Sequence, residues 1–292
     1  MEAGAVTISR PGAAGTATLM NKIRSSRRGR TPARSWFWIV PALLLASNAT
    51  AAVNLSPADT RRIGKRIWQN ECGGTVAGLT SWNAGENFAS LGIGHFIWYP
   101  KGARGPFDES FPKFLQFAAG HGAKLPEFLR AAGDCPWNSR TEFNQSSQTD
   151  SMKALRQFLA GTLDLQAEFL VERLQQALPK MLAAAPASKR AQLQQQFDRV
   201  AASSMGCYAL VDYVNFKGEG VLASERYAGE GWGLLQVLEG MSEAGSGHSA
   251  VKSFAESAGK VLTTRVRNAP PERHESRWLP GWLARINTYV QS

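Results

Sequence analysis

Apolar residues recur every three or four positions over most of the chain beyond residue 52, which is the spacing of one face of an α-helix. The first such segment follows Ser56, a residue type that caps helix N-termini, with Pro57 at the first helical position. Ile63, Ile67 and Glu71 then follow at intervals of four residues. The pattern predicts a helix over 57–71 that carries a carboxylate at the end of its apolar face.

The segment after this helix changes to short apolar runs that are broken by small and polar residues. Gly73, Gly74 and Gly78 end the helical pattern, because glycine is a poor helix former that often terminates helices. Residues 75–99 then carry Gly, Asn and Ser between short apolar runs, as β-hairpins do. We therefore expect a small irregular hairpin sheet in this stretch.

Helical spacing returns after the predicted sheet and continues to the end of the chain. Nine further helices are expected, over residues 111–119, 126–132, 152–160, 163–184, 189–202, 208–216, 232–241, 250–267 and 278–290. The segment 208–216 is apolar nearly all round, which is typical of a helix buried on every side. The chain is therefore predicted to be α+β and mostly α, with a small β-hairpin sheet beside a helical lobe and a cleft between them.

The first 52 residues differ from the rest in composition and have the features of an export signal. A region rich in arginine precedes the apolar run 36–46, and residues 49–51 are small residues of the kind that signal peptidase prefers. Cleavage is expected after Ala51 or Ala52. We therefore interpret residues 1–52 as a signal peptide that is removed on export.

The remaining residues, 53–292, are expected to form one domain, because no repeat or low-complexity linker divides them. The apolar run of the signal covers eleven residues, fewer than the roughly 20 that a membrane-spanning helix needs. No stable membrane anchor is expected after cleavage. The protein is therefore predicted to be periplasmic or secreted.

The net charge gives little support to a nucleic-acid partner. The first 52 residues hold seven of the 33 Lys and Arg residues and one of the 23 acidic residues, so the net charge falls from +10 to +4 without them. No basic stripe with interleaved aromatic residues remains, although nucleic-acid binding usually relies on one. We expect no nucleic-acid partner, and the mild positive charge suits an acidic polymer equally well.

Three cysteines lie in the exported part, which would reach an oxidising compartment. One disulfide is therefore expected, and spacing alone allows three pairings. We favour Cys72 with Cys135, because Cys207 lies in an apolar helical pattern and fits a buried free thiol. Three buried thiols are the alternative.

The end of the first helix and the predicted hairpin carry the strongest indication of chemistry. Glu71 stands at the helix end, and the chain returns through glycine-broken loops to Ser90-Leu91-Gly92-Ile93-Gly94-His95. A Glu at a helix end, followed after a loop by Thr or Ser, any residue, Gly, any residue, Gly and His, is the signature of phage-type lysozymes. The chain thus resembles the superfamily of phage-type lysozymes and related lysozyme-like muramidases.

This resemblance implies a lysozyme-like fold and an activity. The later segments that look like the buried helix and the closing segment of that fold are 208–216 and the residues Arg265, Arg273 and Glu275 before Trp278. Members of the family cleave the β-1,4 linkage between N-acetylmuramic acid and N-acetylglucosamine, so peptidoglycan glycan strands are the expected partner. Glu71 would be the general acid that protonates the scissile linkage.

The resemblance is less complete for the second half of the reaction. In the inverting phage-type enzymes, an Asp of the hairpin and the Thr of the motif position a water on the far face of the sugar. Ser90 keeps the hydroxyl at the Thr position, but no Asp lies between Glu71 and Ser90, and Glu86 is the charged residue that could replace it. Three alternatives stay open: a lytic transglycosylase that uses Glu71 alone, a catalytically inactive glycan-binding protein, and an enzyme for another amino-sugar polymer such as chitosan.

The expected chemistry of Glu71 depends on its surroundings. A carboxyl that donates a proton near neutral pH must stay protonated, and apolar neighbours favour the uncharged form. Ile67, Trp68 and the sheet are expected to provide such neighbours. Gly92 and Gly94 would let the backbone pass close to the cleft and leave room for a sugar.

Five further residues are expected to contact the substrate. Trp82, Trp98 and Tyr99 offer flat apolar faces for sugar rings, although aromatic residues also build cores. Asn83 lies in a predicted turn beside Glu86 and could reach the cleft. His95 completes the group, and it also fits a structural role at the end of the sheet through pairing with an acid.

Other chemistries lack their motifs. The four histidines are scattered, and neither a phosphate-binding glycine loop nor a Gly-x-Ser-x-Gly elbow is present. No cofactor and no metal site are therefore expected. The sequence leaves the oligomeric state open.

Overall fold

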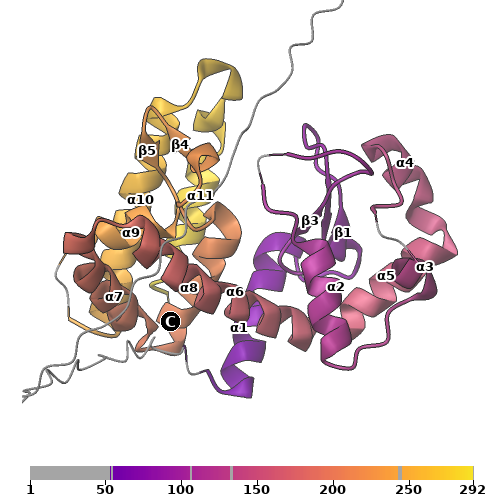
Figure 1. The fold of residues 1–292 in the computed structure, drawn as a ribbon, viewed down its shortest axis with the longest axis horizontal. Helices are drawn as coiled ribbons and strands as arrows, with labels where there is room; N and C mark the ends of the chain where they lie inside the picture. Colours follow the sequence, from indigo (N-terminus) through magenta and orange to yellow (C-terminus); the bar gives the residue numbers. More distant parts are fainter. Residues whose placement is uncertain (1–52, 54, 106, 132–133, 243–244, 292) are drawn as a thin grey trace, which may run out of the picture. The chain divides into compact units, whose positions relative to one another are not determined.

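The computed structural model describes residues 53, 55–105, 107–131, 134–242 and 245–291, all within the unit Asn48–Ser292 (Figure 1). The expected signal peptide over 1–52 lies outside the described residues. Helices make up most of the described chain and a small antiparallel sheet accompanies them, so the predicted α+β, mostly α class is confirmed. No described helix is both long and apolar enough to cross a membrane.

Helix α1 (Pro57–Cys72) forms as the sequence predicts and ends one residue later. Ser56 caps its N-terminus, where Oγ accepts a backbone N–H of the first turn at 3.1 Å. Gly73 adopts the left-handed conformation with φ of 61°, which glycine tolerates because it has no Cβ. Ile67 is fully buried on the inner face. The cap at each end therefore fixes the last turn, which carries Glu71.

The chain after α1 forms the expected irregular sheet. Three short strands, β1 (Thr80–Ser81), β2 (Ala89–Leu91) and β3 (Phe96–Trp98), pair antiparallel in the order β1-β2-β3. Ser81 lies opposite Ser90 in the register. All of β2 is buried, so the sheet is part of the core and holds the Ser90 to His95 motif against the helices.

Ten further helices follow the sheet in the described ranges. They are α2 (Phe111–Gly120), α3 (Glu127–Ala131), α4 (Arg140–Gln145), α5 (Asp150–Gly161), α6 (Leu163–Ala184), α7 (Ala187–Ala201), α8 (Ser204–Lys217), α9 (Leu234–Glu239), α10 (His248–Asn268) and α11 (Leu279–Asn287). Nine of them overlap the nine predicted segments, and α6 has the predicted bounds. Helix α4 was not predicted, because Phe143 alone among its residues is buried and one apolar position gives no periodicity.

The predicted helix over 232–241 is shorter than expected. A second small hairpin, β4 (Arg226–Tyr227) and β5 (Glu230–Gly231), precedes it, and α9 begins after Gly233. The sequence around this hairpin is rich in glycine, which is a poor helix former and favours turns. The hairpin matters for the site, because Tyr227 lies within it and Trp232 follows it.

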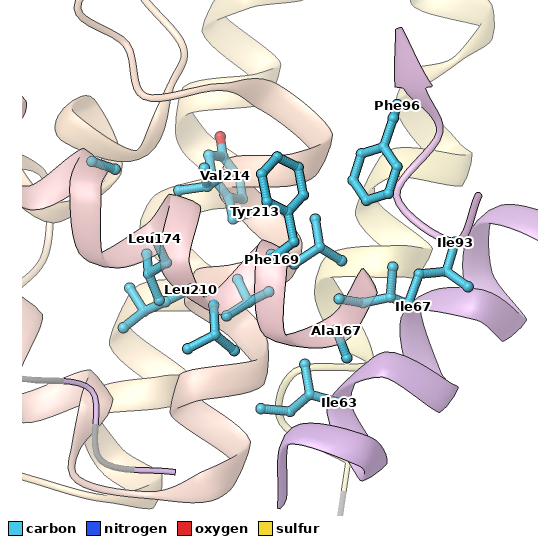
Figure 2. Packing of buried hydrophobic residues seen from close by; sticks show 14 of the residues in the cluster. Ile63, Ile67, Ile93, Phe96, Ala167, Phe169, Leu174, Leu210, Tyr213 and Val214 are labelled. Carbon is cyan, nitrogen blue, oxygen red and sulfur yellow. The ribbon is translucent and has the colours of Figure 1, made fainter. Parts of the chain in front are cut away.

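Helix α8 is the buried spine that its apolar sequence predicts. Residues 206–214 are all buried, and α8 packs against α6, α7, α9 and α10. Figure 2 shows Leu210 and Tyr213 of α8 in one apolar cluster with Phe169 and Leu174 of α6. Charged residues are seldom fully buried unless they are paired. Asp212 of α8 is fully buried, so its carboxylate needs a partner inside the protein.

Helix α1 approaches α6 closely at Gly64. A Cβ built at Gly64 would lie 2.6 Å from the Ala167 Cβ, which is nearer than real Cβ atoms come to each other. Ile63 and Ile67 lie on the same face of α1, and Figure 2 shows both near Ala167. This contact fixes where α1 packs along α6 and thereby the position of Glu71.

The expected disulfide is absent. Cys72, Cys135 and Cys207 are all free and buried. Cys72 Sγ lies 3.5 Å from the Gly92 carbonyl oxygen, and Cys207 Sγ lies 3.2 Å from that of Ala201. Each of these two thiols therefore has its own backbone acceptor. Burial raises the pKa of Cys72 and of Cys135 to about 12, which keeps both thiols protonated and unreactive. The expected Cys72–Cys135 pairing is therefore wrong, and the alternative of three buried thiols agrees with the structure.

Replacing Gly64 tests the close approach of α1 to α6. Gly64→Ala should lower the free energy of unfolding by about 1–3 kcal/mol, because the added methyl group pushes the helices apart. Gly259→Ala in α10 is the matched control, since its methyl group would meet Leu283 at an ordinary 3.6 Å. The control should be neutral or stabilising by up to about 1 kcal/mol through helix propensity. Urea unfolding measures both, and equal stabilities would contradict the close contact.

Candidate functional site

A groove of about 1100 Å³ runs between the sheet and the helices. Its walls come from the end of α1, from the sheet, from α2 and the loop before it, from α6, and from the end of α8. The loop after α8, the β4–β5 hairpin, α10 and the segment after α10 add the remaining side chains. Acidic and basic residues line it together with apolar side chains, so charged groups face the groove from several elements.

Six of the ten predicted site residues line this groove. They are Glu71, Asn83, Glu86, Ser90, Gly94 and His95. The other four, Trp82, Gly92, Trp98 and Tyr99, do not contribute to its wall. The motif therefore brings its polar members to one surface and leaves the aromatic residues elsewhere.

The three predicted aromatic residues belong to the core. Trp98 is 1% exposed and packs against Phe111 and Trp137, with ring centres 4.9 and 6.3 Å away. Trp82 and Tyr99 are 6% and 2% exposed. Their ring faces are covered by protein, so the expectation that they stack on sugar rings disagrees with their placement. The aromatic residues of this small sheet fill the core.

The two motif glycines are required for packing. Gly92 has φ of 73°, and a side chain there would collide with Gln166 and Phe96. Gln166 Oε1 in turn accepts the backbone N–H of Ile93 at 2.8 Å, which ties the turn after β2 to α6. Gly94 would collide with Phe96 as well. Gly94 lines the groove and Gly92 does not. The expectation that these glycines leave room for a sugar therefore applies to Gly94 alone.

Glu71 is bound by cationic and polar groups on the groove wall. Its Oε1 accepts a hydrogen bond from Arg285 Nη2 at 2.7 Å and one from Asn215 Nδ2 at 3.4 Å. Its Oε2 lies 3.5 Å from His95 Nδ1. The Glu71 side chain is 14% exposed, so it reaches the groove while these partners hold it in place.

The apolar surroundings expected for Glu71 are therefore wrong. Ile67 is buried in the core below it, and Trp68 is turned to donate its Nε1–H to the Thr75 carbonyl at 3.2 Å. The groups that touch the Glu71 carboxylate are instead those of α8, α11 and the motif. This arrangement was not visible in the sequence, because Arg285 lies 214 residues away.

A buried ion pair stands behind Glu71. Arg285 donates from Nε and Nη2 to the two oxygens of Asp212, each at 2.8 Å, and Asp212 is fully buried. The Tyr289 hydroxyl donates a further hydrogen bond to Asp212 at 2.6 Å. The cluster thus holds two carboxylates for one guanidinium.

His95 has an unusual conformation between the two predicted catalytic carboxylates. Its φ of 46° lies in the left-handed region, which non-glycine residues seldom occupy. Its Nδ1 faces Glu71, while its buried Nε2 has no hydrogen-bond partner among the described residues. The expected pairing of His95 with an acid agrees with this placement.

Glu86 occupies a different environment on the sheet side. Asn83 Nδ2 donates to its Oε2 at 3.1 Å, and Ser90 Oγ donates to the same atom at 3.5 Å. Burial raises the pKa of Glu86, and the hydrogen bonds of Asn83 oppose this only in part. Three residues that the sequence singled out separately thus form one group on the groove wall.

Several residues of the groove wall, and of the ion pair behind it, were missed by sequence reasoning. Asp212, Asn215 and Lys217 are polar residues in an otherwise apolar buried helix, and such exceptions are a signal that could have identified them. Arg285 gave no such signal, because a basic residue on an amphipathic helix is ordinary. Phe107 is half exposed and lines the groove, so it offers the accessible aromatic surface that the predicted aromatic residues lack.

The segment that resembles the closing part of the fold forms a second charged cluster. Arg265 donates two hydrogen bonds to Glu275, at 2.7 and 2.8 Å, and Tyr227 donates a third at 2.9 Å. The Arg265 guanidinium also lies 4.1 Å from the ring centre of Trp232. Burial alone would raise the pKa of Glu275, but the hydrogen bonds and charge of Arg265 bring it below its usual value.

The described residues contain no group of three His, Cys, Asp or Glu side chains arranged to hold a metal ion. No protein-family model, curated protein or solved structure matches the chain. The geometry of the groove and the residues of the motif therefore carry the functional argument.

Removing the Glu275 charge tests the second cluster. Glu275→Gln should lower the free energy of unfolding by about 3 kcal/mol at neutral pH, because Arg265 loses its buried partner. The depressed pKa of Glu275 means that this stability is present above the unfolded-state pKa and is lost as the pH falls through the folded-state value. Urea unfolding at a series of pH values should show wild type and variant converging in acid. Glu272→Gln, at an exposed position nearby, is the control and should change stability by less than about 0.5 kcal/mol. A difference that persists unchanged into acid would contradict the cluster.

Proposed function

We propose that the protein is a periplasmic or secreted peptidoglycan-cleaving glycosidase with a lysozyme-like fold, in which Glu71 is the general acid. The observation that carries this proposal is that Glu71, at the end of α1, lines the same groove as Glu86 and Ser90 of the sheet segment. Glycosidases work with two carboxyl groups that flank the scissile linkage. The substrate is the β-1,4 linkage between N-acetylmuramic acid and N-acetylglucosamine, as the sequence motif implies.

The position of Glu71 on the groove wall supports its role as the acid. Arg285 donates two hydrogen bonds to Asp212 and one to Glu71, and these contacts hold the Glu71 carboxyl group in place. Glu71 donates its proton to the leaving glycosidic oxygen as the bond to the anomeric carbon breaks. The fixed position of Arg285 then stabilises the carboxylate that forms.

Glu86 and Ser90 act on the water that completes hydrolysis. Ionised Glu86 takes one proton from the water as its oxygen attacks the anomeric carbon, and the Ser90 hydroxyl orients the same water. The water's other hydrogen stays on the new hydroxyl group of the sugar.

The groove is large enough for a polymer. Its volume of about 1100 Å³ is slightly above the roughly 300–1,000 Å³ range of small-molecule pockets. It is lined by carboxylates, amides and basic groups that can hydrogen-bond sugar hydroxyl and acetamido groups. A glycan strand is a better match for such a surface than a compact apolar ligand.

Digestion of purified peptidoglycan tests the proposal directly. Glu71→Gln should reduce the release of soluble fragments by a factor of about 10³ or more, because the amide cannot donate the proton. Glu168→Gln removes a carboxylate from an exposed position of α6 outside the groove, and it should retain activity within about twofold. Equal digestion by wild type and Glu71→Gln would exclude Glu71 as the acid.

The products distinguish the related mechanisms. Reducing sugar ends are expected from hydrolysis, and Glu86→Gln should then abolish activity as well. Anhydro ends with an active Glu86→Gln variant would indicate a lytic transglycosylase that uses Glu71 alone. Binding to peptidoglycan without fragment release by the folded wild type would indicate a glycan-binding protein and would contradict the enzymatic proposal.

The pH profile tests the role of Glu86. As a base Glu86 must be ionised, so the rate should fall as the pH drops through its raised pKa. Asn83→Ala removes a hydrogen bond that lowers this pKa, so the acidic limb of the profile should move to higher pH. Initial rates of fragment release over a series of pH values measure the shift. An acidic limb at the same pH in wild type and variant would contradict a catalytic base at Glu86.

A further inference from the structure

Helix α8 ends with a lysine whose ammonium group lacks an anionic partner. Lys217 is only 9% exposed, yet it lines the groove. Its Nζ lies 3.9 Å from the ring centre of Phe216 and 3.3 Å from that of Trp282. No carboxylate of the described chain forms an ion pair with this Nζ. Burying a charge without a partner costs free energy. The described residues supply no anion at this position.

The acidic groups that act on Lys217 are already bound to arginines. Glu275 accepts two hydrogen bonds from Arg265 and a third from Tyr227. Glu71 accepts its shortest hydrogen bond from Arg285. Neither carboxylate can turn to Lys217 without giving up a cationic partner. No carboxylate of the described residues is therefore free to pair with the Lys217 ammonium group.

A second cation lines the same end of the groove. Arg273 lies in the short helix η4 (Pro271–Arg273), is exposed, and forms no ion pair with a described carboxylate. Its guanidinium lies beside the Tyr227 hydroxyl. The rings of Tyr227 and Trp232 are 4.5 Å apart and form an aromatic surface next to it. This end of the groove therefore combines two unpaired cations with aromatic side chains.

We propose that Lys217 and Arg273 form a subsite that binds a carboxylate carried by the glycan strand. The inference rests on the proposed function and specifies its substrate as an acidic glycan rather than an uncharged amino-sugar polymer. The planar guanidinium of Arg273 suits the two oxygens of a carboxylate, and the ammonium group of Lys217 supplies a compact positive charge. The carboxylate belongs either to the acidic sugar itself or to a peptide attached to it, and the two sources share this chemistry.

Binding at this subsite should be coupled to proton uptake. Burial and the nearby arginine charges hold the pKa of Lys217 well below its usual value in the free protein. The charged groups that act on it from the surrounding elements are Arg265 of α10, Glu275 of η5 (Glu275–Arg277), Arg285 of α11 and Glu71 of α1. A bound carboxylate raises the pKa of Lys217 again, because an opposite charge favours the ammonium form. Affinity for acidic strands should therefore decrease as the pH rises.

Calorimetric titration of the full exported chain tests the subsite, with Glu71→Gln as the parent so that strands are not cut. The probes are an uncharged N-acetylglucosamine oligomer, peptide-free peptidoglycan strands with free sugar carboxylates, and peptide-bearing strands. Lys217→Met, which keeps the apolar stem, should weaken binding of an acidic strand about tenfold or more. The same change should leave the affinity for the uncharged oligomer unaltered. Titration in buffers of different ionisation enthalpy should show proton uptake with acidic strands, which Lys217→Met abolishes.

Lys189→Met is the matched control, because Lys189 lies outside the groove lining and pairs with Glu239 at 3.4 Å. It should leave all affinities unchanged. Arg273→Met, at an exposed position, should weaken acidic strands in the same direction and keeps the test decisive if Lys217→Met fails to fold.

The outcomes separate this inference from the proposed function. Weaker binding of peptide-free strands in the Lys217→Met variant assigns the carboxylate to the sugar, and weakening confined to peptide-bearing strands assigns it to the peptide. Unchanged binding of every strand in the Lys217 and Arg273 variants overturns the subsite and leaves the glycosidase proposal standing. Failure of the folded parent to bind any strand overturns both.

Discussion

The buried ion pair between Asp212 and Arg285 fixes the position on which the site depends. Asp212 lies inside a helix that is enclosed on every side, so its charge could be accommodated only by a partner brought in from another element. Arg285 of α11 provides this partner and at the same time holds Glu71 at the end of α1. One guanidinium thus joins three helices that are distant in the sequence, and removal of either charge would leave the other buried without compensation.

The groove derives its chemistry from the contrast between its two walls. On the helical side, Glu71 is held by charged and polar groups, whereas on the sheet side Glu86 is half buried and bound by neutral donors. The two carboxyl groups therefore have different partners, although both face the same space. Lys217 at the end of α8 adds a third, cationic environment along the same groove. A single strand lying in it would meet these three environments in turn.

The local elements were predictable because short-range signals determine them. The cap at Ser56 and the glycines after Cys72 set the bounds of α1, and the apolar periodicity of α6 gave both of its ends. The contacts of the site were predictable only in part. The group of Asn83, Glu86 and Ser90 lies within eight residues of sequence, whereas the partner of Glu71 lies 214 residues away and carries no local pattern. The aromatic residues were misjudged, since composition does not tell whether a ring face is covered.

The most direct test of the central claim is a crystal structure of the Glu71→Gln variant with a peptidoglycan strand bound. The account predicts that the strand lies in the groove, with its scissile glycosidic oxygen within hydrogen-bonding distance of the side chain at position 71. The Glu86 carboxyl group should then face the opposite side of the same sugar ring, with Arg285 still bridging Asp212 and position 71. A strand bound outside the groove, or one whose glycosidic oxygens all lie beyond reach of position 71, would contradict the account.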